Sequence, residues 1–338
     1  LGGILGAYAI GAWFDRARRD YLADLASGVG TIIFGAAIAL VGQMYHLGGD
    51  FTAAVLLWAI GAVIAAGFTN SLGALATALV AVCIWNGMRV VETSDVYTPI
   101  VGFIAFWVVA AFLALVWNRP VARHLVSVAA VVGVLTWSLN IEARQGHQLL
   151  LFCAGMSLLL GAGLALATHE LDSVRALGLT WANYGAVALA IGLAFATLDF
   201  EQKWTSGLSS AAQIPTAWAV ASAFIGLFLA GAVAAITRRI GPALVGIAIG
   251  LALASFFDKH WLGHGFWLAY ALVLSSLLSL IISGIFDDIR PRVFGGWVGL
   301  ALVIAIITWG MEEPLRYRAL FLVLAGIIAI ALAAVLER

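Results

Sequence analysis

The segment from Gln43 to Asp50 carries the residue types in this sequence that are best suited to chemistry. Gln43 and Tyr45 bring hydrogen-bonding groups, His46 brings an imidazole, and two glycines precede the carboxylate of Asp50. The glycines permit a tight turn that directs this carboxylate over the ends of neighbouring helices. Asp50 could bind a sugar or a cation, or act as a general base on an exported substrate. It could equally cap a helix that begins at Phe51, because aspartate is a strong N-cap residue.

A second turn with similar residues follows later in the chain, where His260-Trp-Leu-Gly-His264 precedes another apolar stretch. Imidazoles and a carboxylate together would suit zinc. These groups nevertheless lack a local ligand spacing such as His-Glu-x-x-His. We therefore predict no metal and no cofactor. The candidate substrate-binding residues are Gln43, Tyr45, His46, Asp50, His260 and His264.

The elements that position these residues are long apolar blocks. Hydrophobic residues make up 64% of the 338 residues and charged residues only 10%, whereas a soluble domain carries about 25% charged residues. About 20 apolar residues in a helix cross a bilayer, so we predict an all-α, polytopic transmembrane helix bundle of about 13 crossings. These crossings are residues 1–14, 25–45, 52–67, 71–88, 98–117, 123–140, 148–168, 177–197, 215–236, 242–257, 266–286, 293–310 and 318–336.

The crossings follow one another through short gaps, so we expect residues 1–338 to form a single transmembrane helical domain. A weak internal repeat relates residues 25–67 to residues 242–286, because both contain a helix, a His-Leu-Gly or His-Trp-Leu-Gly turn and a new helix. The block at residues 1–14 spans only about 21 Å at helical rise, less than a bilayer core. We therefore expect an N-terminal truncation, with this block as the end of a complete crossing.

The basic residues predict the orientation. Eleven of the seventeen lysines and arginines fall in alternate gaps that include residues 15–24 and the C-terminus. Cytoplasmic loops carry the excess of these residues, so we expect gap 15–24 and the C-terminus in the cytoplasm and gap 46–51 in the periplasm. The lipid bilayer is then the principal partner. A net charge of zero gives no basic surface for nucleic acid.

The middle of each block holds very little polar chemistry. No Asp, Glu, Lys or Arg lies near the centre of a crossing, and no proline interrupts one. Both absences argue against a proton- or sodium-coupled transporter with a central charged site. Asn183, Tyr184 and Asn140 are expected to form hydrogen bonds between helices. The pairs Gly2/Gly6, Gly246/Gly250 and Gly295/Gly299 have the small-xxx-small spacing that predicts closely packed helices.

One stretch of the sequence is similar to a known family. Gly42-Gln-Met-Tyr-His-Leu-Gly-Gly-Asp50-Phe, followed by Leu56-Leu-Trp-Ala59, resembles an uncharacterised bacterial multi-pass membrane protein family, domain of unknown function 2157. The resemblance is specific over about 35 residues. It implies a bacterial inner-membrane location and carries no activity with it.

Three functions are compatible with these features. The favoured hypothesis is a membrane-embedded protein that binds or translocates an amphiphilic or lipid-linked substrate, with a polar outer face. The second is a non-catalytic accessory or scaffold subunit that works with other membrane-protein subunits. The third is an enzyme at the outer face with Asp50 as the base, which the short outer gaps make less favourable. An enclosed polar cavity lined by Gln43, Tyr45 and Asp50 would favour the first or the third.

Overall fold

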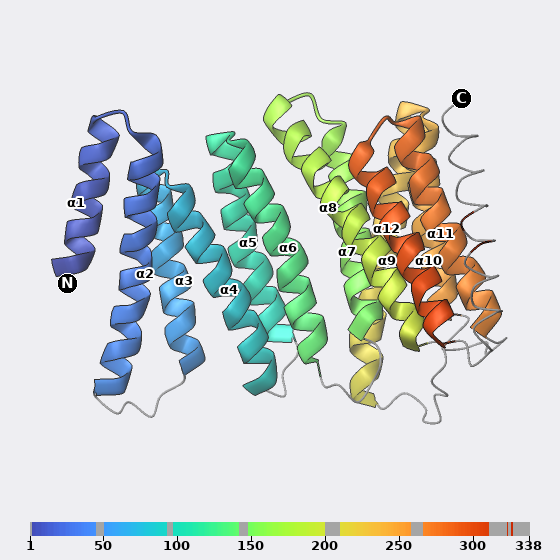
Figure 1. Cartoon of the computed structure of the whole chain (residues 1–338), viewed down its shortest axis with the longest axis horizontal. Helices are drawn as coiled ribbons and strands as arrows, with labels where there is room; N and C mark the ends of the chain where they lie inside the picture. Colours follow the sequence, from blue (N-terminus) through green and yellow to red (C-terminus); the bar gives the residue numbers. More distant parts are fainter. Residues whose placement is uncertain are drawn as a thin grey trace. The chain divides into compact units, whose positions relative to one another are not determined.

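A computed structural model describes residues 2–44, 51–92, 97–141, 148–199, 210–257 and 266–310, together with 323 and 326. Within these residues the fold is entirely helical, with twelve α-helices and one short 3-10 helix (Figure 1). Eleven of the helices are long and apolar enough to cross a membrane. The prediction of an all-α transmembrane bundle is therefore confirmed. Only residues 323 and 326 of the last predicted crossing, 318–336, are described. The predicted repeat turns at His46 and His260 lie outside the described residues.

The first of two compact units comprises residues Leu1–Arg144. In this unit α4 packs against α2, α3, α5 and α6, and α1 packs against α2. α4 is accordingly the helix of this unit with the most extensive buried face. The helices are α1 (Gly2–Arg16), α2 (Asp20–Met44), α3 (Phe51–Thr69), α4 (Leu72–Glu92), α5 (Tyr97–Trp117) and α6 (Pro120–Asn140).

The second unit comprises residues Gln145–Arg338. Its described helices pack in a closed ring, in the order α7, α8, α12, α11, α10, α9 and back to α7. Weaker contacts join α7 to α10 and α8 to α11 across the ring. The elements are α7 (Gln148–Ala167), α8 (Asp172–Ala196), η2 (Thr197–Asp199), α9 (Ser210–Thr237), α10 (Ile240–Phe257), α11 (Phe266–Phe286) and α12 (Arg290–Gly310).

Several helices begin before the apolar blocks that predicted them. α2 begins at Asp20 instead of residue 25, α8 at Asp172 instead of 177, and α12 at Arg290 instead of 293. An aspartate in the first turn of α2 and of α8 interacts favourably with the positive end of the helix dipole. Proline is tolerated in the first turn because that turn has no intrahelical bond to lose, and Pro120 opens α6 in this way. Hydropathy thus locates the crossing, while the helix extends beyond it.

Five of the six described turns between consecutive helices have the same form. In each, one residue adopts the left-handed conformation, and the next helix begins two residues later. At the α1–α2 turn the N–H of Arg19 donates to the carbonyl of Phe14, and at the α11–α12 turn the N–H of Ile289 donates to the carbonyl of Gly284. These bonds close the preceding helix as a Schellman motif does. The left-handed residues are Arg18, Asn70, Asn118, Arg238 and Asp288, with φ between 51° and 54°.

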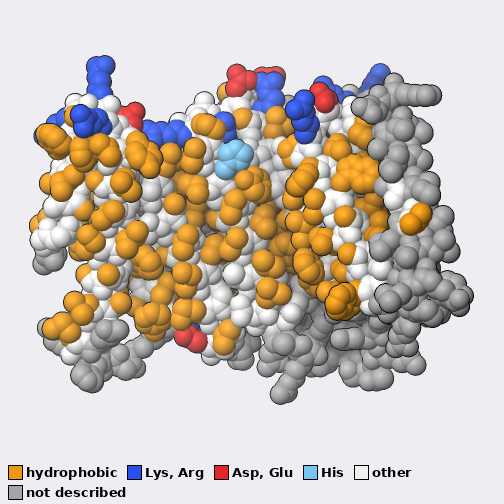
Figure 2. All heavy atoms as spheres, in the orientation of Figure 1, with side chains coloured by type: hydrophobic (Ala, Val, Ile, Leu, Met, Phe, Trp, Pro, Cys, Tyr) orange, Lys and Arg blue, Asp and Glu red, His pale blue; other side chains and the backbone are white. Residues whose placement is uncertain are grey.

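The charged side chains gather at these turns. Of the arginines that the structure describes, all except Arg89 lie in the six described turns or within the first or last turn of the adjoining helices. Figure 2 shows basic side chains near the helix ends and apolar side chains along the helix flanks. The opposite ends of the helices lead into segments outside the described residues. This distribution agrees with the alternation of basic gaps in the sequence, but which side of the membrane it faces remains a prediction.

Glycines bring helix backbones together at places that the spacing rule only partly predicted. A Cβ on Gly295 or Gly299 of α12 would lie 2.9 Å from backbone atoms of α8, so this predicted pair is confirmed. Gly246 and Gly250 have only ordinary contacts, and no described atom lies within 4 Å of a Cβ on Gly2 or Gly6. The prediction of close packing at these two pairs is wrong for the described residues, because spacing does not tell which way a helix face points.

Candidate functional site

The predicted substrate-binding residues fall almost wholly outside the described residues. Tyr45, His46, Asp50, His260 and His264 are all among the residues that the structure leaves undescribed, and Gln43 is placed only as a backbone position near the end of α2. The site therefore remains a prediction. Within the described ranges, no three His, Cys, Asp or Glu side chains come together to hold a metal.

The bounds of the helices give these segments a location within each unit. α2 starts at the arginine-rich α1–α2 turn and ends at Met44, and α3 starts at Phe51. The segment 45–50 therefore joins the ends of α2 and α3 that lie opposite the α1–α2 turn. By the same reasoning the segment 258–265 joins the ends of α10 and α11 opposite the α9–α10 turn. The described residues that flank each candidate segment thus lie a helix length from the arginine-rich end of their own unit.

Uncharged amides lie within the crossings. Asn86 of α4 is completely buried and donates through Nδ2 to the carbonyl of Gly133 in α6, at 2.8 Å. Its Oδ1 accepts no hydrogen bond from any described group, and the buried Oδ1 of Asn183, in the middle of α8, accepts none either. Asn140 donates within its own helix, to the carbonyl of Thr136. The described hydrogen bond of Asn140 thus lies within one helix, whereas Asn86, which the sequence analysis did not single out, forms a hydrogen bond between helices.

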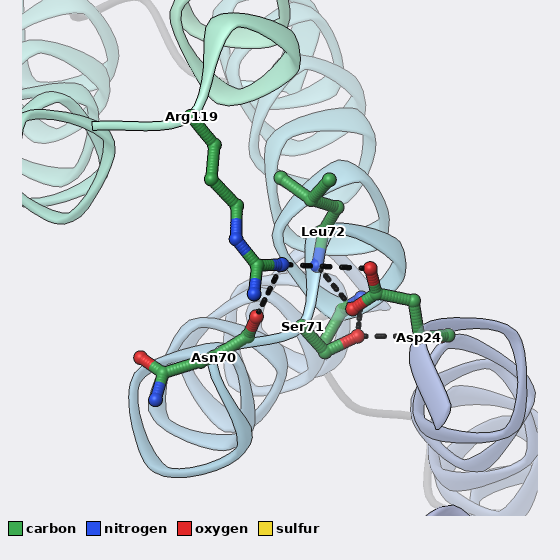
Figure 3. A network of polar contacts seen from close by, with 6 residues as sticks. Asp24, Asn70, Ser71, Leu72 and Arg119 are labelled. Carbon is green, nitrogen blue, oxygen red and sulfur yellow. Dashed lines mark hydrogen bonds and ion pairs between the residues drawn. The ribbon is translucent and has the colours of Figure 1, made fainter. Parts of the chain in front are cut away.

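A polar network lies at the arginine-rich end of the first unit, where Asp24 of α2 meets the start of α4 (Figure 3). The carboxylate of Asp24 accepts a hydrogen bond from the N–H of Leu72 through Oδ1, at 3.0 Å. The hydroxyl of Ser71 donates to the main-chain carbonyl of Asp24, at 3.2 Å, and accepts from the N–H of Ala74. Ser71 and Asp24 together thus satisfy N–H groups that the first turn of a helix leaves without partners.

Arg119 connects this network to the α5–α6 turn. Its Nη1 lies 3.6 Å from Oδ2 of Asp24 and donates to the carbonyl of Asn70, at 3.3 Å. Arg119 thus bonds the residue that adopts the left-handed conformation in the α3–α4 turn. The carboxylate is about one-fifth exposed and the guanidinium two-fifths, so this ion pair by itself contributes at most about 1 kcal/mol. The larger effect is to hold two turns and α2 in one arrangement.

The approach of α2 to α4 requires glycine on both helices. Cα of Gly28 lies 3.2 Å from the position of a Cβ on Gly73, and the carbonyl oxygen of Asp24 lies 2.6 Å from that position. A methyl group at residue 73 would therefore push α4 away from the carboxylate that caps it. The sequence contains no local signal for this contact, because the partners are 45 or more residues apart.

The second unit has a related arrangement with a more deeply buried arginine. Arg292 of α12 is 1% exposed, and its Nη1 donates to Asp287 at 2.8 Å and to the hydroxyl of Ser283 at 3.3 Å. A Cβ on Gly241, at the start of α10, would clash with the carboxylate of Asp287. This carboxylate therefore lies against a helix N-terminus, where negative charge is stabilised by the helix dipole. The pair was not foreseen, because both residues belong to a gap that reads as solvated.

The geometry of these networks is that of structural supports. The carboxylate oxygens of Asp24 and the Nη1 of Arg292 are occupied by partners within the protein. The carboxylates stabilise helix starts, and the arginines fix the adjoining turns. Inside the described crossings, the buried polar atoms that have no partner and could serve a ligand include the uncharged oxygens of Asn86 and Asn183.

Comparison with known proteins supports the resemblance. Residues 1–75 match the family model described as predicted membrane protein (DUF2157). The match covers α1, α2, α3 and the start of α4, and so includes the segment 43–50, Asp24 and the Gly28–Gly73 contact. No curated protein and no solved structure matches the chain. The predicted family resemblance is thus confirmed over these residues, and the chain is a multi-pass membrane protein.

Proposed function

We propose that this multi-pass membrane protein binds or translocates an amphiphilic or lipid-linked substrate. Its polar part would be held by Gln43, Tyr45, His46 and Asp50 and by the histidines of segment 258–265. The observation that carries the proposal is the distribution of charge along the helices. At the arginine-rich ends the buried charges serve as helix supports, and the described crossings contain no Asp, Glu, Lys or Arg at their centres.

An uncharged interior suits a substrate with a long apolar part. A charged or strongly hydrated substrate would need compensating charges inside the membrane, since burying an unpaired charge there is costly. The buried oxygens of Asn86 and Asn183, which accept no bond within the described residues, can accept from hydroxyl or amide groups without adding charge. These features support an amphiphile more than an inorganic ion.

A scaffold function within a larger membrane complex is the second candidate, and the glycine contacts of α7 favour it. A Cβ on Gly161 would meet the backbone of Gly226 in α9, and a Cβ on Gly163 would lie 2.7 Å from the carbonyl of Gly178 in α8. α7 is thus held between two helices at backbone contact. Backbone contact on both sides of α7 keeps these three helices together as one rigid group, which is compatible with a scaffold and with a static binding protein.

Substitution of Asp50 separates these functions. If the carboxylate only caps α3, Asp50→Asn should behave as the wild type, because Asn caps about as well as Asp, while Asp50→Ala should lose about 1 kcal/mol of stability. If the carboxylate binds or acts on a substrate, we expect Asp50→Asn to abolish function at normal protein levels. The measurement is complementation of a deletion strain by both variants, with membrane protein quantified by immunoblot. Full complementation by Asp50→Asn would remove Asp50 from the site, and with it the outer-face enzyme.

We further infer that the arginine-rich turns face the cytoplasm of a bacterial inner membrane, because basic residues are retained on that side. Arg19 and Glu92 are exposed and lie at opposite ends of helices in the first unit. With Cys83 and Cys153 replaced by alanine, a cysteine at Glu92 should react with an impermeant maleimide in intact cells. A cysteine at Arg19 should react only after permeabilisation. Equal labelling of both in intact cells would contradict the orientation.

A further inference from the structure

The five left-handed turns differ in the residue that adopts the left-handed conformation. Asn70, Asn118 and Asp288 are suited to it, because short polar side chains tolerate it well. Arg18 and Arg238 are not, since the Cβ lies too close to the following carbonyl oxygen, at a cost of roughly 1–2 kcal/mol, and arginine lacks the short polar group that offsets this cost. An arginine at such a position lowers the stability of the fold, and asparagine would lower it less. The α9–α10 turn bears this cost and follows Arg238 with a second arginine, Arg239.

The arginines of the α9–α10 turn are exposed, and no hydrogen bond or ion pair of their side chains occurs within the described residues. Some of the other arginines in the described turns do have such partners. Arg119 pairs with Asp24, Arg175 with Asp172 and Arg292 with Asp287. The Arg238–Arg239 pair is therefore not needed to hold the fold together.

The charge around this pair is positive. The described parts of α9 and α10 contain no acidic residue. The neighbouring α11–α12 turn adds Asp287, whose charge is offset by buried Arg292, and the exposed residues Asp288 and Arg290, which offset each other. The α7–α8 turn, at the end of the α7 helix that packs against α9, adds Glu170 beside the Asp172–Arg175 ion pair, so it offsets only part of the charge of the two arginines. The α1–α2 turn is different, because Asp15 and Asp20 lie close to its arginines in the sequence. The α9–α10 turn is thus the more strongly cationic of the two.

Exposed aliphatic side chains border the same two arginines. Ile236 is 80% exposed and Ile240 is 57% exposed. Ile236 lies in the last turn of α9, and Ile240 is the first residue of α10. An apolar residue exposed at the end of a membrane-spanning helix meets acyl chains, so the guanidinium groups lie at the level of lipid phosphates. A dissolved anion would gain nothing from the isoleucines, whereas a phospholipid can contact both.

We propose that Arg238 and Arg239, with Ile236 and Ile240, form a binding site for an anionic phospholipid. The guanidinium groups bind the phosphate of its headgroup, with planar donors that match phosphate oxygens. The isoleucines contact the upper part of the acyl chains. Juxtamembrane basic residues attract anionic lipids in general. The α9–α10 turn adds a fixed position, because a two-residue turn between packed helices holds both arginines in place.

The test measures lipid preference next to the turn. Ala235→Cys, at an exposed position beside the site, in a chain with Cys83 and Cys153 replaced by alanine, carries a bimane label in nanodiscs. Brominated phosphatidylglycerol should quench this label more strongly than brominated phosphatidylcholine. In Arg238→Asn/Arg239→Gln the preference should fall about fivefold for each arginine. Asparagine tolerates the left-handed conformation at residue 238 better than arginine does, so this variant should melt at the wild-type temperature or above. Arg239→Gln alone, with an expected loss of about fivefold, provides a second reading that leaves the left-handed residue unchanged.

Arg123→Gln/Arg175→Gln is the matched control, because it changes the net charge equally at other turns. We expect it to retain the preference. An equal loss in the control would show general attraction to the membrane and overturn the site. An unchanged preference for phosphatidylglycerol in both Arg239→Gln and Arg238→Asn/Arg239→Gln would overturn it as well. Inorganic phosphate at millimolar concentration should leave the quenching unaltered, and displacement of the lipid by phosphate would show a site for free anions instead.

Discussion

Replacing Arg292 by methionine should destabilise the folded protein by about 3–5 kcal/mol, the usual effect of leaving one member of a buried ion pair without its partner. Methionine has a similar length and leaves the packing of α12 largely filled. Asp287, whose side chain is 11% exposed, would then lie against the start of α10 without its arginine partner. Unfolding of the purified protein in mixed micelles with increasing SDS mole fraction measures the loss.

Arg290→Met is the control for this substitution. Arg290 lies in the same first turn of α12 but is exposed, and the change should shift stability by less than about 0.5 kcal/mol. Asp287→Asn in the Arg292→Met background should recover much of the loss, because it removes the charge that lacks a partner. If Arg292→Met is as stable as Arg290→Met, the pair does not support the ring of helices.

Gly226→Ala should destabilise the protein by about 1–3 kcal/mol or more, although alanine is the better helix former. A Cβ on Gly226 would meet the backbone carbonyl of Ser157 in α7. Backbone cannot rotate away as a side chain can, so α9 would have to move from α7, and contacts along both helices would loosen. The free energy of unfolding from the same SDS titration should fall accordingly.

The matched substitution is Gly231→Ala in the same helix. No described atom lies within 4 Å of a Cβ at Gly231, so stability should stay unchanged or rise by up to about 1 kcal/mol through helix propensity. The two variants add the same methyl group five residues apart. A similar change in stability for both would mean that α7 and α9 do not touch at Gly226.

The number and order of the described helices could be predicted from the sequence, because bilayer thickness imposes a block length on each crossing. The ends of the helices were less accessible. Residues such as Asp20 and Asp172 are too polar for the bilayer core, so hydropathy places them outside the crossings. They nevertheless belong to the helices, because an acidic side chain in the first turn interacts favourably with the helix dipole.

The side-chain contacts could hardly be predicted at all. A Gly-xxx-Gly spacing shows that two small residues share a helix face, but whether that face meets another helix depends on how the helix is rotated. Gly295 and Gly299 meet α8, Gly2 and Gly6 have no described atom within 4 Å of an added Cβ, and Gly226 makes its contact without a second glycine four residues away. The Asp24 network joins residues up to 95 positions apart along the chain, Asp24 and Arg119. No local sequence pattern predicts a contact between residues so far apart along the chain.

The two-residue turns also bear on how the chain enters the membrane during synthesis. No lysine or arginine occurs between Arg19 and Arg89, so the turn at Asn70 has no basic residue to retain it on one side. The short turn nevertheless obliges α3 and α4 to enter as an antiparallel pair, because two residues cannot reach across a bilayer. The orientation of this pair is then inherited from its neighbours. Arginines added on the far side of such a pair would have to reverse both helices together.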